Sequence, residues 1–162
     1  MSTVLDIWPD LPIAVITDFD FRGPTSDDKL IMAIRHYDRV YEISLRSFFR
    51  KRHLESFVSV MQVPFPALTD LAFTFKFHHE LDRTLPVLPD SFLGRSAPRL
   101  RHLELEGLSF PGLPNLLLST SGLASLKLRC IPHSWYISPE AMVALLNALT
   151  RLELLTLQFE FH

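Results

Sequence analysis

One recurring pattern limits the fold of this chain more than any other feature. In its simplest form the pattern is Leu-x-x-Leu-x-Leu, with other apolar residues replacing leucine in places. It occurs five times, at residues 40–45, 68–73, 100–105, 123–128 and 152–157, and a weaker apolar segment at residues 13–17 precedes them. Self-similarity at intervals of about 20–45 residues is typical of chains built from stacked, similar units.

The second half of each block alternates between apolar and polar residues, which is the period of a β-strand. In the third block, Leu103 and Leu105 alternate with Glu104 and Glu106. Side chains alternate between the two faces of a strand, so each strand should have one apolar and one polar face.

Between several blocks the apolar residues take the three- and four-residue spacing of a helix. We expect helices near residues 26–37, 54–61 and 138–149, with Ser26 capping the first and Ser138 the last. Prolines divide the segments 84–97 and 111–121, so these should form only one-turn or 3₁₀ pieces.

Alternating strands and helices imply a parallel sheet with right-handed crossovers. A doubly wound sheet buries both faces and would have continuously apolar strands. Here only one face is apolar, and all the strands share one motif. We therefore predict an α/β leucine-rich-repeat-like right-handed solenoid, a short horseshoe with a parallel sheet on one face and helices on the other. It should form a single domain over residues 1–162, with five to six irregular repeats.

The repeats resemble those of one group of leucine-rich-repeat proteins, the basidiomycete fungal proteins of the F-box type. Five short motifs carry the resemblance and occur in order over most of the chain. They are HYDRVYEISL at 36–45, PFPALT at 64–69, VLPDSFLG at 87–94, SAPRLR at 96–101 and YISPEAM at 136–142.

This resemblance implies a non-catalytic, protein-binding module, the substrate-recognition part of an F-box ubiquitin-ligase receptor. The repeats of such a receptor hold an unknown protein target, and its F-box docks on a cullin-ligase adaptor. No F-box segment precedes Ile13, so the adaptor is expected as a partner only if an F-box lies upstream. With one cysteine and no long apolar run, the chain is expected in the cytoplasm or nucleus.

Binding is expected on the polar face of the sheet. In the expected register, Glu104 faces Lys127 and Glu106 faces Arg129. These charges could form ordinary cross-strand ion pairs, or a mixed-charge patch that recognises a partner. A net charge of −2 favours neither nucleic acid nor membrane as the partner. The candidate binding residues are Glu42, Ser44, Arg46, Asp70, Thr74, His102, Glu104, Glu106, Lys127, Arg129, Thr156 and Gln158.

An enzyme is the alternative class. The apolar segment 13–17 followed by Asp18 and Asp20 is similar to the opening of haloacid-dehalogenase-type phosphatases, which implies a nucleophile, an acid/base and bound magnesium. That motif expects Thr or Val where this chain has Arg22, and no later acidic pair is evident. The protein-binding hypothesis is therefore preferred, and no catalytic residue is assigned.

Other reactive groups lack the companions that their chemistry needs. Cys130 and His133 have no evident third group to orient them, and the pair His78–His79 has no further zinc ligands at a suitable spacing. We expect no metal and no cofactor. The aromatic residues Trp135 and Tyr136 either cover a core edge or anchor a partner. The last strand, near residues 155–159, should leave an open edge that favours self-association.

Overall fold

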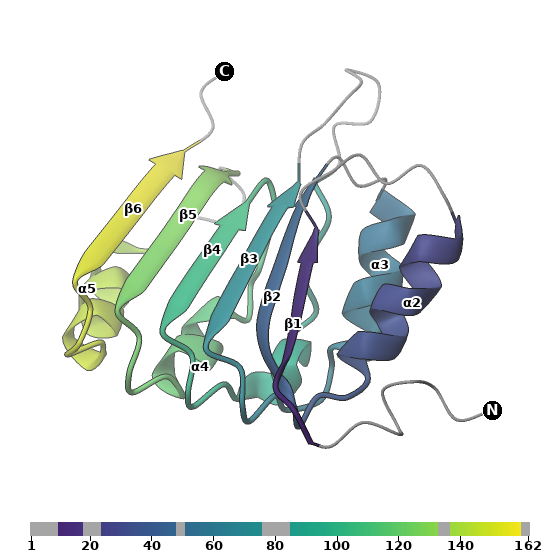
Figure 1. Cartoon of the computed structure of the whole chain (residues 1–162). Coiled ribbons are helices and arrows are strands. Elements are labelled where there is room, and N and C mark those ends of the chain that lie inside the picture. Colours follow the sequence, from purple (N-terminus) through teal and green to yellow (C-terminus); the bar gives the residue numbers. More distant parts are fainter. Residues whose placement is uncertain (1–9, 18–23, 48–50, 76–84, 133–136, 160–162) are drawn as a thin grey trace.

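The computed structural model describes residues 10–17, 24–47, 51–75, 85–132 and 137–159. Its centre is one parallel sheet of six strands, which lie side by side in the order of the sequence (Figure 1). An α/β fold with a parallel sheet is therefore confirmed. The strands are β1 (Ile13–Thr17), β2 (Val40–Ser47), β3 (Asp70–Phe75), β4 (His102–Glu106), β5 (Ser125–Ile131) and β6 (Leu154–Phe159).

The register aligns equivalent positions of the repeated blocks. On one face, Ile43 pairs with Leu71, which pairs with Leu103, and the same row continues through Leu126 and Leu155. The first four of these side chains are at most 2% exposed. The recurring leucines therefore form continuous apolar rows across the sheet, as their period of two requires.

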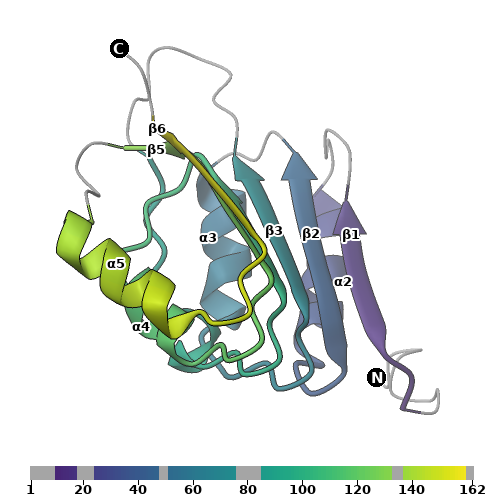
Figure 2. The ribbon, with the colours of Figure 1, turned by 90° about the vertical axis from the view of Figure 1, so that its left-hand side faces the viewer.

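Four helices and one 3₁₀ turn cover this apolar face, and Figure 2 shows the helices on the same side of the sheet. Burying one face of a sheet under helices is how such strands remove their apolar side chains from water. The other face carries no helix in the described part of the chain. The elements are α2 (Pro24–Ile34), α3 (Lys51–Val60), η1 (Phe92–Arg95), α4 (Leu113–Leu118) and α5 (Pro139–Ala148).

Two helix starts show where local sequence signals succeed and fail. The backbone N–H of Ala141 donates to Ser138 Oγ at 3.2 Å, so the predicted cap of α5 is confirmed. The predicted cap at Ser26 is wrong, because α2 begins two residues earlier, at Pro24. The fixed φ of proline suits the first turn of a helix. Of the two short pieces, η1 is a tight turn in which Leu93 and Gly94 have positive φ, so it is not a regular 3₁₀ helix, and α4 is a six-residue α-helix.

Aromatic residues fill the middle of the core between the sheet and its cover. Phe92 of η1 is fully buried, with its ring centroid 5.9 Å from that of Phe73 and 5.5 Å from that of Phe110. Such tilted and edge-on pairs add to the free energy gained by burying the rings. The connection through η1 thus contributes to the core although it lacks a regular helix.

The β6 end of the sheet is less well covered. Leu155 and Phe159 are 37% and 44% exposed, although their register partners on β5 are buried. The ladder is also irregular here: Leu128 pairs with Leu157 and Ile131 with Phe159, and Cys130 has a φ of 51°. Two residues of β5 thus lie opposite one of β6, which is a β-bulge. No helix within the described ranges is long and apolar enough to cross a membrane.

Candidate binding surface on the open face of the sheet

The face that the helices leave uncovered has three rows of side chains, one row for each outward position of the strands. All twelve residues proposed as binding residues lie on these strands. Gln158 has no register partner of its own because it lies opposite the bulge of β5. The rows are Glu42, Asp70, His102, Ser125, Leu154; then Ser44, Ala72, Glu104, Lys127, Thr156; then Arg46, Thr74, Glu106, Arg129.

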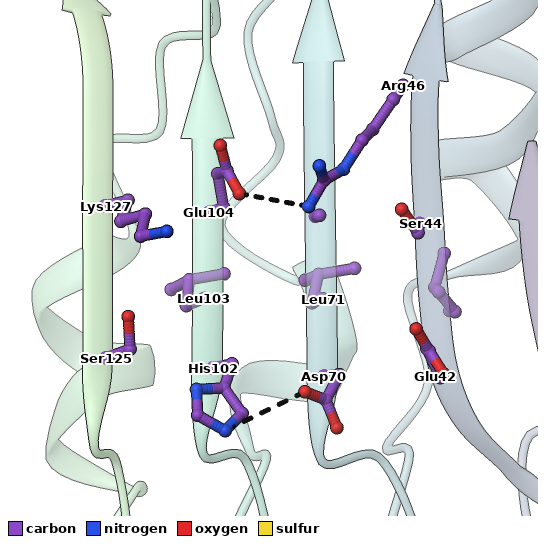
Figure 3. Close-up of a pocket in the computed structure, with 12 residues that line it drawn as sticks. Glu42, Ser44, Arg46, Asp70, Leu71, His102, Leu103, Glu104, Ser125 and Lys127 are labelled. Carbon is purple, nitrogen blue, oxygen red and sulfur yellow. Dashed lines mark hydrogen bonds and ion pairs between the residues drawn. The ribbon is translucent and has the colours of Figure 1, made fainter. Parts of the chain in front are cut away.

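A hollow of about 240 Å³ lies over the middle of this face. Side chains of four neighbouring strands, β2 to β5, form its lining, and Figure 3 shows them around it. Both acidic and basic groups reach the hollow, since Glu42 and Asp70 lie on one side of it, Arg46 on another and Lys127 on β5. A surface of this composition suits a ligand that carries charges of both signs.

The basic side of the hollow is organised around Glu104. Arg46 Nη2 donates to Glu104 Oε2 at 3.3 Å, and Arg129 Nη1 lies 3.5 Å from Glu104 Oε1. Arg129 Nη1 also lies 3.9 Å from Glu106 Oε2. The Glu104 side chain is only 15% exposed, so these contacts are better shielded from water than a typical surface pair. Two arginines thereby hold Glu104, and their charges are already compensated.

The contact between Arg46 and Glu104 crosses a whole strand, from β2 to β4. Ala72 of β3 lies between them in the row, in register with Ser44 and Glu104. Its short side chain leaves room for the arginine to extend over it, and Ala72 is only 9% exposed as a result. Ala72 is not among the candidate binding residues proposed from the sequence. A small residue in the middle of a row of polar ones is the signal that could have indicated it.

The register predicted for the charged residues is confirmed, since Glu104 pairs with Lys127 and Glu106 with Arg129. The ion pairs follow the register only in part. Glu106 contacts Arg129, whereas Glu104 contacts the two arginines, and Lys127 forms no ion pair with any described residue. In Figure 3, Lys127 extends from β5 toward β4 with its ammonium group over the face. Lys127 is therefore available to a partner.

The first row brings two carboxylates together. Glu42 and Asp70 are register partners on neighbouring strands. Thr69 Oγ1 donates to Asp70 Oδ2 at 2.6 Å, which fixes the orientation of this carboxylate. The nearest cationic candidate, His102 Nε2, lies 4.0 Å from Asp70 Oδ1. This side of the hollow therefore has uncompensated negative charge.

Ser44 lies between the acidic and the basic sides of the hollow. It is 9% exposed and lines the hollow. Its hydroxyl has no hydrogen-bond partner among the described residues, although a hydroxyl can both donate and accept. The hydroxyl is not enclosed, since among the described residues the enclosed side-chain oxygen without a partner is Thr17 Oγ1, so Ser44 can offer its hydroxyl to a ligand in the hollow.

The open face extends further than the proposed residues. Ala14 and Ile16 of β1 are register partners of Glu42 and Ser44, and Ile16 is 51% exposed. Residues 13–17 are Ile-Ala-Val-Ile-Thr and do not alternate between apolar and polar residues, so only the burial pattern of the folded chain shows that β1 belongs to this surface. An apolar contact area therefore borders the acidic side of the hollow.

Several residues considered for chemistry lie outside the described part of the chain. These are Asp18, Asp20, Arg22, His78, His79, His133, Trp135 and Tyr136. Within the described ranges, no group of three or more His, Cys, Asp or Glu side chains could hold a metal ion.

No protein-family model matches the chain, and no curated protein matches its sequence.

Proposed function

We propose that this chain is a non-catalytic protein-binding domain of the leucine-rich-repeat type, a right-handed solenoid whose open sheet face holds a protein target. One observation carries the proposal: a face of polar and charged side chains extends across the sheet on the side opposite to the helices. A flat, rigid strand surface positions side chains for recognition without a cost of ordering loops. The sequence resemblance adds the proposed role of target recognition in a cytoplasmic or nuclear ubiquitin ligase, with the cullin-ligase adaptor as a partner only if an F-box lies upstream.

The test compares two faces of the same protein. The tagged chain captures proteins from a lysate, and mass spectrometry identifies them. In one variant, Thr74→Trp and Thr156→Trp place two large side chains on the open face, at positions where aromatic residues suit a strand. In the matched control, Met32→Trp and Val143→Trp place the same side chains on exposed positions of α2 and α5.

We expect the open-face variant to lose the captured proteins by about tenfold or more and the helix-face variant to retain them. Equal retention by both variants, or loss only in the helix-face variant, contradicts the proposal. Magnesium-dependent hydrolysis of p-nitrophenyl phosphate that disappears in Asp18→Asn would contradict it as well and would favour an enzyme. Folding of each variant is checked by circular dichroism, so that loss of capture reports on the surface.

A further inference from the structure

The charges of the hollow divide into those that are compensated within the protein and those that are not. Arg46 and Arg129 share Glu104, and Arg129 also contacts Glu106. Glu42 and Lys127 remain without an ion pair in the described residues, and Asp70 has only His102 Nε2 at 4.0 Å, so two carboxylates face at most one positive charge. The two carboxylates lie on neighbouring strands, and the ammonium lies on the far side of the hollow.

The two carboxylates form a site of net negative charge that a cationic group of a partner can bind. Like charges at register positions of neighbouring strands repel each other. A guanidinium group has five donors in a planar fork and can bind two carboxylates at once. Ser44, nine-tenths buried and without a partner, lies one row above Glu42 and is an additional acceptor at the floor of the same hollow.

The distance between the uncompensated charges follows from the sheet. Neighbouring strands lie about 4.8 Å apart, so β5 is about 10 Å from β3 and about 14 Å from β2. An extended peptide rises by about 3.3 Å per residue. Because side chains of an extended segment alternate between its two faces, two side chains four residues apart, about 13 Å, lie on the same face and would reach both sides of the hollow.

Resting on the function proposed above, we propose that the open face recognises an extended partner segment with an arginine and, four residues away, an acidic residue. The arginine binds Glu42 and Asp70 above Ser44, and the acidic residue binds Lys127. Arg46 positions Glu104 and leaves Lys127 free for the partner. The exposed Ile16 borders the acidic side and gives the segment an apolar contact.

The test uses synthetic peptides of twelve residues with blocked ends. One has Arg-Ala-Ala-Ala-Glu at its centre, and a second has the reversed order, since the segment can cross the strands in either direction. A third has glutamine in place of both charged residues, and a fourth has glutamine in place of the glutamate only. Each is titrated into the ¹⁵N-labelled chain at up to millimolar concentration, and the amide shifts of β2 to β5 are followed.

We expect saturable shifts at residues 42–46, 70–74 and 125–129 with one of the two charged peptides, and none with the double-glutamine peptide. Glu42→Gln with Asp70→Asn should weaken binding of that peptide by about tenfold. Lys127→Met should abolish the preference for the peptide with glutamate over the one with glutamine. The matched control Glu55→Gln, which removes an exposed carboxylate from α3, should leave binding unchanged.

Absence of saturable shifts with both charged peptides, or equal binding by the Glu42→Gln, Asp70→Asn variant, overturns the inference. These outcomes are distinct from failure of the proposed function. If captured proteins depend on the open face in the tryptophan test but are insensitive to Glu42→Gln with Asp70→Asn, the open face binds a target by other contacts. The amide spectrum of each variant also shows whether it remains folded.

Discussion

At the scale of single residues, the two carboxylates on the acidic side of the hollow are proposed to bind a partner. They also repel each other, which lowers the free energy of unfolding. Glu42 and Asp70 are in register on adjacent strands, and no described residue neutralises Glu42. The hydrogen bond from Thr69 fixes Asp70, so it cannot turn far from its neighbour. Residues selected only for folding would avoid this arrangement.

We therefore expect Glu42→Gln to raise the free energy of unfolding by about 0.5 kcal/mol, because it removes the repulsion and keeps the shape of the side chain. Urea denaturation at low ionic strength measures the change. In about 1 M salt, where the screening length is about 3 Å, the difference should largely disappear. Glu55→Gln on α3 is the control and should change stability by less. A Glu42→Gln variant that is less stable than the original chain would contradict this account.

The positions of the candidate site residues followed from the sequence because a strand has a strict period of two. The contacts that these residues make with one another did not follow from the sequence. The register placed Glu104 opposite Lys127, yet the reach of an arginine over Ala72 gives Glu104 a different partner. Contacts of long side chains depend on which rotamers the neighbours leave open, and a linear pattern does not contain that information.

At the scale of elements, the turn after β4 depends on one glycine. Gly107 has a φ of 71°, and its N–H donates to the carbonyl of Arg129 at 3.1 Å. A Cβ at this position would collide with the carbonyl oxygen of Phe75 at the end of β3. Both the left-handed backbone at residue 107 and the close approach of the end of β3 therefore require glycine.

We expect Gly107→Ala to lower the free energy of unfolding by about 2 kcal/mol, through strain and the displaced strand end. Gly122→Ala is the matched control, since nothing lies within 4 Å of a Cβ there and its φ is not positive. That variant should be as stable as the original chain or up to about 1 kcal/mol more stable. Thermal and urea unfolding measure both changes. Equal effects of the two substitutions would argue against a special role for Gly107.

The order and type of most elements could be predicted from the repeated leucines and from the helical spacing between them. The positions at which these helices and strands begin and end could not be predicted in the same way. α2 begins at Pro24, whose fixed φ suits the first turn of a helix and competes with the serine cap signal two residues later. The bulge at Cys130 depends on how β5 pairs with β6, and local signals reflect such pairing only weakly.

At the scale of the whole molecule, the chain buries one face of its sheet along most of its length and leaves the other face to solvent. The core is continuous from β2 to β5, where the repeated leucines are at most 3% exposed. The parallel order of the strands followed from the alternation of strand and helix patterns. The difference in how well helices cover the sheet at its β1 and β6 ends did not follow from this pattern, because it depends on how far each helix extends over the neighbouring strands.

The incomplete cover at β6 leads to a prediction of self-association. Among the described residues, β6 pairs with β5 alone, and Leu155 and Phe159 are exposed at this edge. An exposed strand edge with apolar side chains can pair with a second copy of the chain.

Light scattering should therefore give a mass above 18.6 kDa that rises with concentration. Leu155→Lys with Phe159→Lys should restore the monomer, since edge lysines oppose pairing. Leu118→Lys on α4, at a side chain that is 63% exposed, is the control and should still associate. A chain that keeps the mass of one copy at high concentration would contradict the prediction and would show that the edge is protected in solution.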